Sequence, residues 1–339
     1  MRVFRLIPTL LALMLLSNAA TAATAAEKLP ALGADPTKTS TSGLSSGAFM
    51  ALQYDVAFSA STIGVGVVAG GPYNCFGVNG GDIHTCMQGA PKGAASYAAA
   101  QGFANLRQID SIDHLASQKI YMFSGTNDLV VKQSVMNAVW DFFRAAQVPD
   151  TSIQYVKQLP AGHAFISADF GNHCPTTESP FIDECAVDGA NYDQPNAILS
   201  QIYGPLHPKS ATLSSAPMAF DQREFASPLA HMADTGYVYI PSACKKGGTL
   251  KCAVHVVFHG CSQSADTDHV GDAVYGKLGY NAWADSNGII VLYPQVNATT
   301  IINPNGCWDW FGYTGPFFQI KASPQLSAVR AMVMRLVKN

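Results

Sequence analysis

The sequence predicts an α/β protein in which a mostly parallel sheet is covered by helices on both faces. One observation is a series of short apolar runs rich in β-branched residues, separated by stretches of helical periodicity. Another is a GxSxG motif between an extended stretch and a helical pattern. No repeat, heptad pattern or low-complexity linker interrupts this alternation after the first residues. Together these features favour one domain built on a single sheet.

The chain begins with the pattern of a secretory signal peptide. Arg2 and Arg5 precede an apolar run over 6–16, and small residues follow over 17–26. The run is shorter than the roughly 20 residues that a membrane-spanning helix needs. We therefore expect a signal peptide over 1–22, cleaved as late as residue 26. The single catalytic domain would then be 27–339, outside the cell or held in a periplasm, with no membrane association.

The GxSxG motif is Gly43-Leu44-Ser45-Ser46-Gly47, and the helix after it is expected over 48–58. In a nucleophile elbow the turn from strand to helix is so tight that the flanking positions must be glycine, and it exposes the serine above the sheet. Ser45 is therefore the candidate nucleophile. The motif alone is weak, because a chance match in a loop is the ordinary alternative.

An acid and a histidine follow Ser45 in the order that an α/β-hydrolase requires. The expected strands are 63–69 and 119–123, and the turn after the second carries Asp128. A helix with an apolar face through 135–143 leads to a strand over 153–156, and His163 stands in the next loop. His163 would be the general base and Asp128 the residue that orients it. Either residue alone could be an ordinary loop residue, but the ordered set predicts a catalytic triad.

The rest of the chain is expected to supply the remaining strands and helices. Residues 164–235 are loop-rich, with one expected helix over 195–203, and we interpret them as an insertion beside the active site. Strands are expected over 254–258 and 289–293, with a helix through 275–285 between them. Ser323 followed by Pro324 is a typical start for the last helix.

A loop that resembles an oxyanion loop stands in an unusual place. The backbone N–H of Ser46 is the first expected oxyanion donor, and the second usually comes from a loop after an earlier strand. His259-Gly260-Cys261-Ser262-Gln263 follows a strand directly, but about two hundred residues after Ser45. A circular permutation explains this order and predicts that the chain ends meet in space. The alternative is that His259 is a core or metal histidine and the order is accidental.

The cysteines and charges narrow the class of protein. Eight cysteines in an exported chain favour disulfides. Spacing suggests three local pairs and leaves a fourth: Cys75–Cys86, Cys174–Cys185, Cys244–Cys252 and Cys261–Cys307. A metal site is the alternative, but no CxxC pair appears. Charged residues make up only 13% of the chain and the net charge is -3. The composition therefore gives no sign of a basic surface that would bind nucleic acid.

Five ordered segments carry a resemblance to a known family: GLSSGAF, GTND, AGHAF, HGCSQ and GCWDWFGYTG. Together they resemble the extracellular poly(3-hydroxybutyrate) depolymerases with a circularly permuted catalytic domain. The resemblance implies a triad of Ser45, Asp128 and His163, and an oxyanion hole from the N–H groups of Ser46 and Cys261. It also implies that aromatic residues near Cys307 bind the polymer.

The resemblance makes a hydrophobic polyester the expected substrate. The aromatic residues would be Trp308, Trp310, Phe311 and Tyr313, although ordinary core packing could claim about half of them. Many family members carry a separate polymer-binding domain, and we expect none in this chain, which we expect to be a monomer. The chemistry needs no cofactor or metal. The alternatives are a feruloyl or acetylxylan-type carboxylesterase and a hydrolase-like binding protein without activity, although no triad member is missing.

Overall fold

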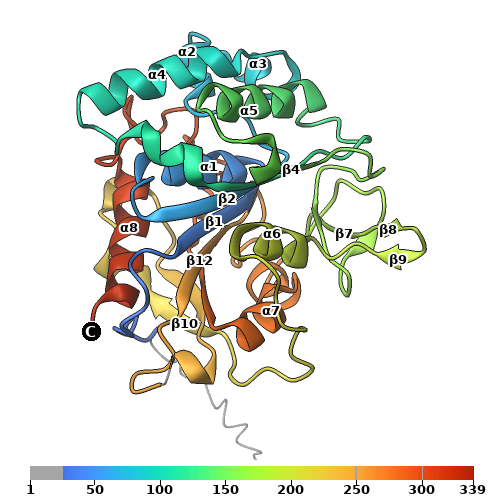
Figure 1. Ribbon diagram of the computed structural model, residues 1–339, viewed down its shortest axis with the longest axis vertical. Helices are drawn as coiled ribbons and strands as arrows, with labels where there is room; N and C mark the ends of the chain where they lie inside the picture. The colour runs from blue at the N-terminus through green and yellow to red at the C-terminus, as the bar shows by residue number, and fades with distance from the viewer. Residues whose placement is uncertain (1–25, 249, 300) are drawn as a thin grey trace, which may run out of the picture.

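An eight-stranded sheet forms the centre of the molecule (Figure 1). The computed structural model describes residues 26–248, 250–299 and 301–339, and the expected signal peptide lies outside them. In spatial order the strands are β10 (Met218–Asp221), β11 (Thr235–Tyr239), β13 (Ile289–Tyr293), β12 (Ala253–Phe258), β1 (Thr39–Leu44), β2 (Thr62–Val68), β3 (Lys119–Phe123) and β4 (Ile153–Val156). β11 runs antiparallel to both of its neighbours, and every other pairing in this sheet is parallel. The structure is therefore the predicted α/β-hydrolase type of sheet.

The order of the strands is circularly permuted, as predicted. If counting starts at β10 and returns to β1 after β13, the spatial order reads 1-2-4-3-5-6-7-8. In this count the strand before the oxyanion loop precedes the nucleophile strand, as in an ordinary α/β-hydrolase. The backbone N–H groups of Leu32 and Ala34 donate to the carbonyl of Leu336, and that of Gly33 donates to Lys338. The N-terminal part of the described chain thus lies against the end of the last helix, where a permuted chain requires it.

Helices cover both faces of the sheet. The helices on one face enclose the larger apolar cluster: α1 (Ser46–Ala57), α4 (Gly93–Asn105), α5 (Gln133–Ala145) and α8 (Pro324–Val337). α6 (Gln194–Tyr203) and α7 (Tyr280–Asn287) pack on the other face. Two short helices, α2 (Cys75–Val78) and α3 (Ile83–Gln88), lie next to α4 and α5 at the top of Figure 1. Among the described helices none is long and apolar enough to cross a bilayer.

The helix expected through 275–285 is divided into two pieces. A π-helical turn covers Ala273–Lys277, and α7 begins only at Tyr280. Gly279 between them has φ 116, a conformation that an α-helix cannot contain. The apolar periodicity did not reveal this break.

Residues 164–235, expected to be a loop-rich insertion, contain three kinds of structure. Small sheets lie at the right of Figure 1, formed by β5 (Phe165–Ile166), β6 (Asn172–His173) and β7 (Ile182–Glu184), and by β8 (Ala186–Val187) and β9 (Ala190–Asn191). α6 covers the central sheet, and β10 is an edge strand of that sheet. Only the part before α6 therefore stands outside the central layers. Short 3-10 turns cover Ile112–Ser117, Asp150–Ser152, Gln222–Glu224, Pro228–Ala230 and Ser242–Cys244.

Candidate active site

Ser45 occupies a strained turn between β1 and α1. Its backbone has φ 57 and ψ -121, which is unfavourable for a residue with a side chain. A Cβ on Gly43 would lie 2.2 Å from the carbonyl oxygen of Gly47, and one on Gly47 would lie 2.3 Å from that of His259. Both flanking positions therefore have room only for glycine. This geometry is that of a nucleophile elbow.

Asp128 and His163 form a buried pair on the loops after β3 and β4. Asp128 Oδ2 lies 2.8 Å from His163 Nδ1, and neither side chain is more than 7% exposed. The other carboxylate oxygen accepts the backbone N–H groups of Val130 and Val131 at 2.8 and 2.9 Å. Because a carboxylate can only accept, the imidazole donates from Nδ1 to Asp128 and leaves Nε2 as the acceptor. A histidine held in this way can accept a proton from a serine hydroxyl.

A pocket of about 280 Å³ contains both Ser45 and His163 in its wall. Its other lining residues are Leu44, Met87, Val130, Thr177, Phe181, Gly260, Cys261, Ser262 and Asn305. Within the described chain, Ser45 Oγ makes no hydrogen bond to His163, a contact that often tightens only when substrate binds. Thr177 Oγ1 accepts the backbone N–H of His163 at 2.9 Å. The pocket thus brings together the serine and histidine that the sequence proposed.

The loop after β12 lines the same pocket. Among the residues that the structure describes, the backbone N–H groups of Ser46 and Cys261 donate no hydrogen bond. Ser46 is the first residue of α1, so its N–H has no partner inside the helix and lies at the positive end of the helix dipole. Two free donors on adjacent segments suit an oxyanion.

His259 has a different environment from His163. It is fully buried, its Nδ1 donates to the carbonyl of Gly260 at 2.7 Å, and its Nε2 accepts the backbone N–H of Val296 at 3.1 Å. Burial lowers its pKa to about 4. Both nitrogens are engaged and the ring is neutral, so His259 is a core histidine that holds the loop.

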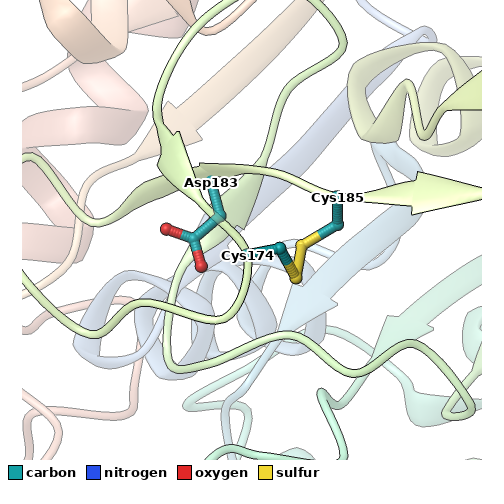
Figure 2. A group of neighbouring side chains, drawn as sticks. All are labelled: Cys174, Asp183 and Cys185. Atoms are coloured by element: carbon teal, nitrogen blue, oxygen red, sulfur yellow. A yellow bond between two sulfur atoms is a disulfide. The ribbon is translucent and has the colours of Figure 1, made fainter.

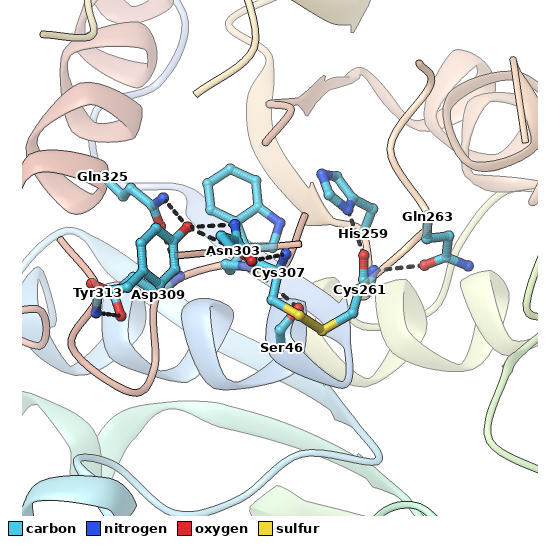
Figure 3. The surroundings of a disulfide bond; sticks show 11 residues. Ser46, His259, Cys261, Gln263, Asn303, Cys307, Asp309, Tyr313 and Gln325 are labelled. Carbon is cyan, nitrogen blue, oxygen red and sulfur yellow. Dashed lines mark hydrogen bonds between the residues drawn. A yellow bond between two sulfur atoms is a disulfide. The ribbon is translucent and has the colours of Figure 1, made fainter. Parts of the chain in front are cut away.

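A disulfide joins the oxyanion loop to the segment before Trp310 (Figure 3). Cys261 pairs with Cys307, and the backbone N–H of Trp308 donates to Ser46 Oγ at 3.3 Å. The side chain of Asn303 accepts the backbone N–H of Cys307 and donates to the carbonyl of Cys307, both at 2.8 Å. The other disulfides are Cys75–Cys86, Cys174–Cys185 and Cys244–Cys252, so all four pairs are those expected from the sequence.

The four aromatic residues expected to bind substrate lie outside the lining of the Ser45 pocket. Trp308 is fully buried with its ring edge-on to Phe258, so the expectation that it contacts substrate is wrong. Trp310 is only 6% exposed and stacks on Phe49 at 4.4 Å. Neither of these tryptophans, nor Phe311 or Tyr313, lines the Ser45 pocket.

Sequence reasoning missed the apolar residues that do line the pocket. Met87, on α3, belongs to the same small cluster as Trp310 and the half-buried Phe311, so that cluster adjoins the pocket. Thr177 and Phe181 come from the loop-rich segment after His163. No motif marks these positions, because they reach the pocket only through tertiary packing.

Among the described residues one group of side chains has potential metal-binding atoms close together, but these atoms cannot act as a set of metal ligands. It consists of Cys174, Asp183 and Cys185 (Figure 2). The two sulfur atoms are bonded to each other, so neither is a thiolate. One carboxylate remains, which is too few ligands for a zinc site.

Comparisons with known proteins agree with this geometry. No protein-family model matches the chain. A poly(3-hydroxybutyrate) depolymerase of Delftia acidovorans is 41% identical over 324 residues, which cover 92% of this chain and 62% of that protein, slightly less than two thirds of its length. A polyhydroxybutyrate depolymerase of Talaromyces funiculosus is 36% identical over 334 residues, covering 92% of this chain and 93% of that protein.

Two solved structures are also similar. One is a PHB depolymerase, a serine-to-alanine variant complexed with an R3HB trimer, with a TM-score of 0.82 and 34% identity. The other is a PHB depolymerase from Penicillium funiculosum, with a TM-score of 0.81 and 35% identity. Each match covers 91% of this chain and 98% of the other chain.

Proposed function

This chain belongs to the family of poly(3-hydroxybutyrate) depolymerases, and on that premise we propose that it hydrolyses the ester bonds of poly(3-hydroxybutyrate) or related polyesters through an acyl-enzyme on Ser45. The products are monomers and short oligomers. The observation that carries this proposal is the 2.8 Å pair of Asp128 and His163 at a pocket that also contains the strained Ser45.

The proposed reaction has two steps. Ser45 Oγ attacks the ester carbonyl while His163 Nε2 accepts its proton, and Asp128 stabilises the imidazolium that forms. The N–H groups of Ser46 and Cys261 donate to the oxyanion, and His163 then returns the proton to the leaving hydroxyl group. A water molecule, activated by His163, releases the 3-hydroxyacyl group in the same way.

The composition of the pocket favours a polyester over the alternative esters. Leu44, Met87, Val130 and Phe181 give it an apolar lining beside the uncharged polar residues Thr177, Ser262 and Asn305, and His163 is the one ionisable side chain among the lining residues. A polymer with methyl side groups and no charge fits such a lining. A feruloyl or sugar ester has several hydroxyl groups that need hydrogen-bonding partners, and beyond the catalytic residues this lining offers only the side chains of Thr177, Ser262 and Asn305. A hydroxyl group left without a partner in a buried site is costly.

We also propose that the protein is exported and acts as a monomer. The four disulfides require an oxidising compartment, and the first residues have the pattern of a signal peptide. The catalytic domain of this proposal extends over 27–339.

Replacing Ser45 by alanine tests the assignment. We expect Ser45→Ala to lose on the order of 10⁶ in rate while the fold is kept, because the triad acts as a unit. The measurement is clearing of amorphous polyhydroxybutyrate granules, with product analysis and circular dichroism. Ser327→Ala, an exposed serine on α8, is the matched control and should keep full activity. Normal turnover by Ser45→Ala, or rapid cleavage of methyl ferulate or acetylated xylan while granules stay turbid, would contradict the proposal.

A further inference from the structure

Gln263 is the last residue of the oxyanion loop, and the proposed reaction gives it no role. Its side chain is buried, with 1% exposed. Oε1 accepts the backbone N–H of Gly260 at 2.6 Å, and Nε2 donates to the carbonyls of Pro180 and Phe181 at 2.8 and 3.1 Å. Figure 3 shows it near His259 and Cys261, at the Cys261 end of the disulfide. One side chain therefore pairs three backbone groups from two segments.

These two segments form separate parts of the pocket wall. Gly260 and Cys261 contribute the oxyanion loop, whereas Thr177 and Phe181 come from the segment between Cys174 and Cys185. This second segment also fixes the general base, because Thr177 Oγ1 accepts the backbone N–H of His163. A link between the segments consequently sets how the oxyanion donors lie relative to His163.

Phe181 is the place where such a link is needed. Its φ of 56 is in the left-handed region, which is unfavourable for a residue with a large side chain. A strained residue keeps this conformation only when its surroundings hold it. Three hydrogen bonds hold it. Its N–H donates to the carbonyl of Glu178 at 2.7 Å, and its carbonyl accepts the backbone N–H of Phe165 at 3.0 Å and the side chain of Gln263 at 3.1 Å.

We propose that Gln263 is a positioning residue that fixes the oxyanion loop against the Thr177–Phe181 wall, and so sets the width of the pocket and the direction of the Cys261 N–H. The inference rests on the proposed function. Glutamine is suited to this role because one end accepts and the other end donates twice. An ionised glutamate has no donor and would direct an oxygen at two carbonyl oxygens. A methionine would fill a similar volume but leave the N–H of Gly260 and the carbonyl of Pro180 unpaired, and the carbonyl of Phe181 would keep only the N–H of Phe165.

The chain offers a matched control in Gln222. This buried side chain also accepts one backbone N–H, from Gln295 at 2.9 Å, and donates to two carbonyls, of Ala233 and Gln295, at 2.7 and 3.0 Å. It does not line the pocket. Q222E and Q263E thus remove equivalent hydrogen bonds and introduce the same charge, and a difference in catalysis between them reports position.

The experiment compares Q263E, Q263M and Q222E with the wild type on a short p-nitrophenyl ester between pH 5 and 9. Rates are expressed per Ser45 labelled by an organophosphate, so that unfolded enzyme does not count, and melting temperatures are recorded. We expect all three variants to melt at lower temperature. Only Q263E and Q263M should lose kcat, on the order of 10²-fold, with a smaller change in KM, because a small displacement of the oxyanion donors has an effect of that size.

The pH profile separates positioning from loss of stability. The kcat ratio of Q263E to wild type should rise as pH falls, because a protonated glutamic acid can donate to one of the two carbonyls, while the ratio for Q263M stays flat. Other ionisable groups near these segments include His163, His259, Glu178 and Asp183. Both enzymes share them, so dividing by the wild type removes their effect. Unchanged kcat per labelled site in Q263E, or in Q263M if Q263E does not fold, overturns the inference. A wild type that the organophosphate does not label at Ser45 contradicts the proposed function instead.

Discussion

At the scale of single residues, the hydrogen-bond partners of a histidine decide what it can do. His163 has one nitrogen on a carboxylate, and its other nitrogen has no partner in the described part of the chain and can accept from a hydroxyl group. Both nitrogens of His259 are bonded to the backbone. Burial lowers the pKa of His259 to about 4, so it stays neutral at the pH at which an esterase works. Both residues follow a strand in the sequence, and only the structure separates their roles.

Substituting each histidine in turn tests this distinction. We expect His163→Ala to prevent labelling of Ser45 by an organophosphate, because no other described residue of the pocket wall carries a base that can accept the serine proton. His259→Ala should still be labelled, more slowly, and should melt at a lower temperature because a fully buried side chain leaves a cavity and an unpaired N–H on Val296. Intact-mass spectrometry follows the labelling, with the exposed His207→Ala as control. The opposite pattern would exchange the two roles.

At the scale of elements, local sequence patterns predicted the long strands and the loops that follow them. The strands β3, β4 and β13 have the expected bounds, and Asp128 and His163 follow the first two. The two- and three-residue strands between His163 and α6 carry no periodicity, since they form only by pairing with one another. Burial of Trp308 was missed for a similar reason: aromatic clustering does not reveal that the ring packs on β12.

Asp183, on β7, lies at the centre of these short strands and has an unfavourable environment for its charge. Its Oδ2 accepts the backbone N–H of Thr176 at 2.9 Å, and its Oδ1 has no partner among the described residues. Burial raises its pKa to about 6. Because this value exceeds the roughly 3.9 of a free aspartate, the folded state binds the proton more tightly than the unfolded state. Stability should therefore fall as pH rises from about 4 to about 6 and stay reduced above that.

The variant Asp183→Asn removes this pH dependence and keeps an acceptor for Thr176. We expect its melting temperature relative to wild type to be higher at pH 8 than at pH 4, by on the order of 3 °C. Differential scanning calorimetry at the two pH values measures the change. Asp188→Asn, at an exposed turn in the same region, is the control and should show no such trend. If the melting temperature of Asp183→Asn differed from that of the wild type by the same amount at both pH values, the pKa of Asp183 would be the same in the folded and unfolded states, which would contradict the prediction.

At the scale of the whole molecule, the active site is assembled from two halves of the chain that only the closed sheet brings together. β1 with Ser45 pairs with β12, which carries the oxyanion loop, in a parallel register from Thr39 opposite Val254 to Gly43 opposite Phe258. The order of the motifs was enough to predict the permutation. It did not indicate the edge strand β10, which follows a long loop and pairs with β11 on one side and, through an isolated bridge at Phe220, with Glu27. The fold thus depends on which strands are neighbours, and the place where the chain begins is secondary.

Moving the chain ends provides a direct test of that conclusion. A variant can join residue 339 to residue 26 through a short Gly/Ser linker and open between Ala211 and Thr212, which are exposed in the loop before β10. The new order starts at β10, and no hydrogen bond of the central sheet is interrupted. Because residues 32–34 already bond to 336–338, joining these ends should cost little loop entropy, and we expect native circular dichroism with activity within about tenfold of wild type. A variant opened inside β12, between Val256 and Val257, is the control and should not fold, because it divides a buried central strand. If the first variant also failed to fold, the ends would not be interchangeable, and the order in which the strands leave the ribosome would have to direct folding.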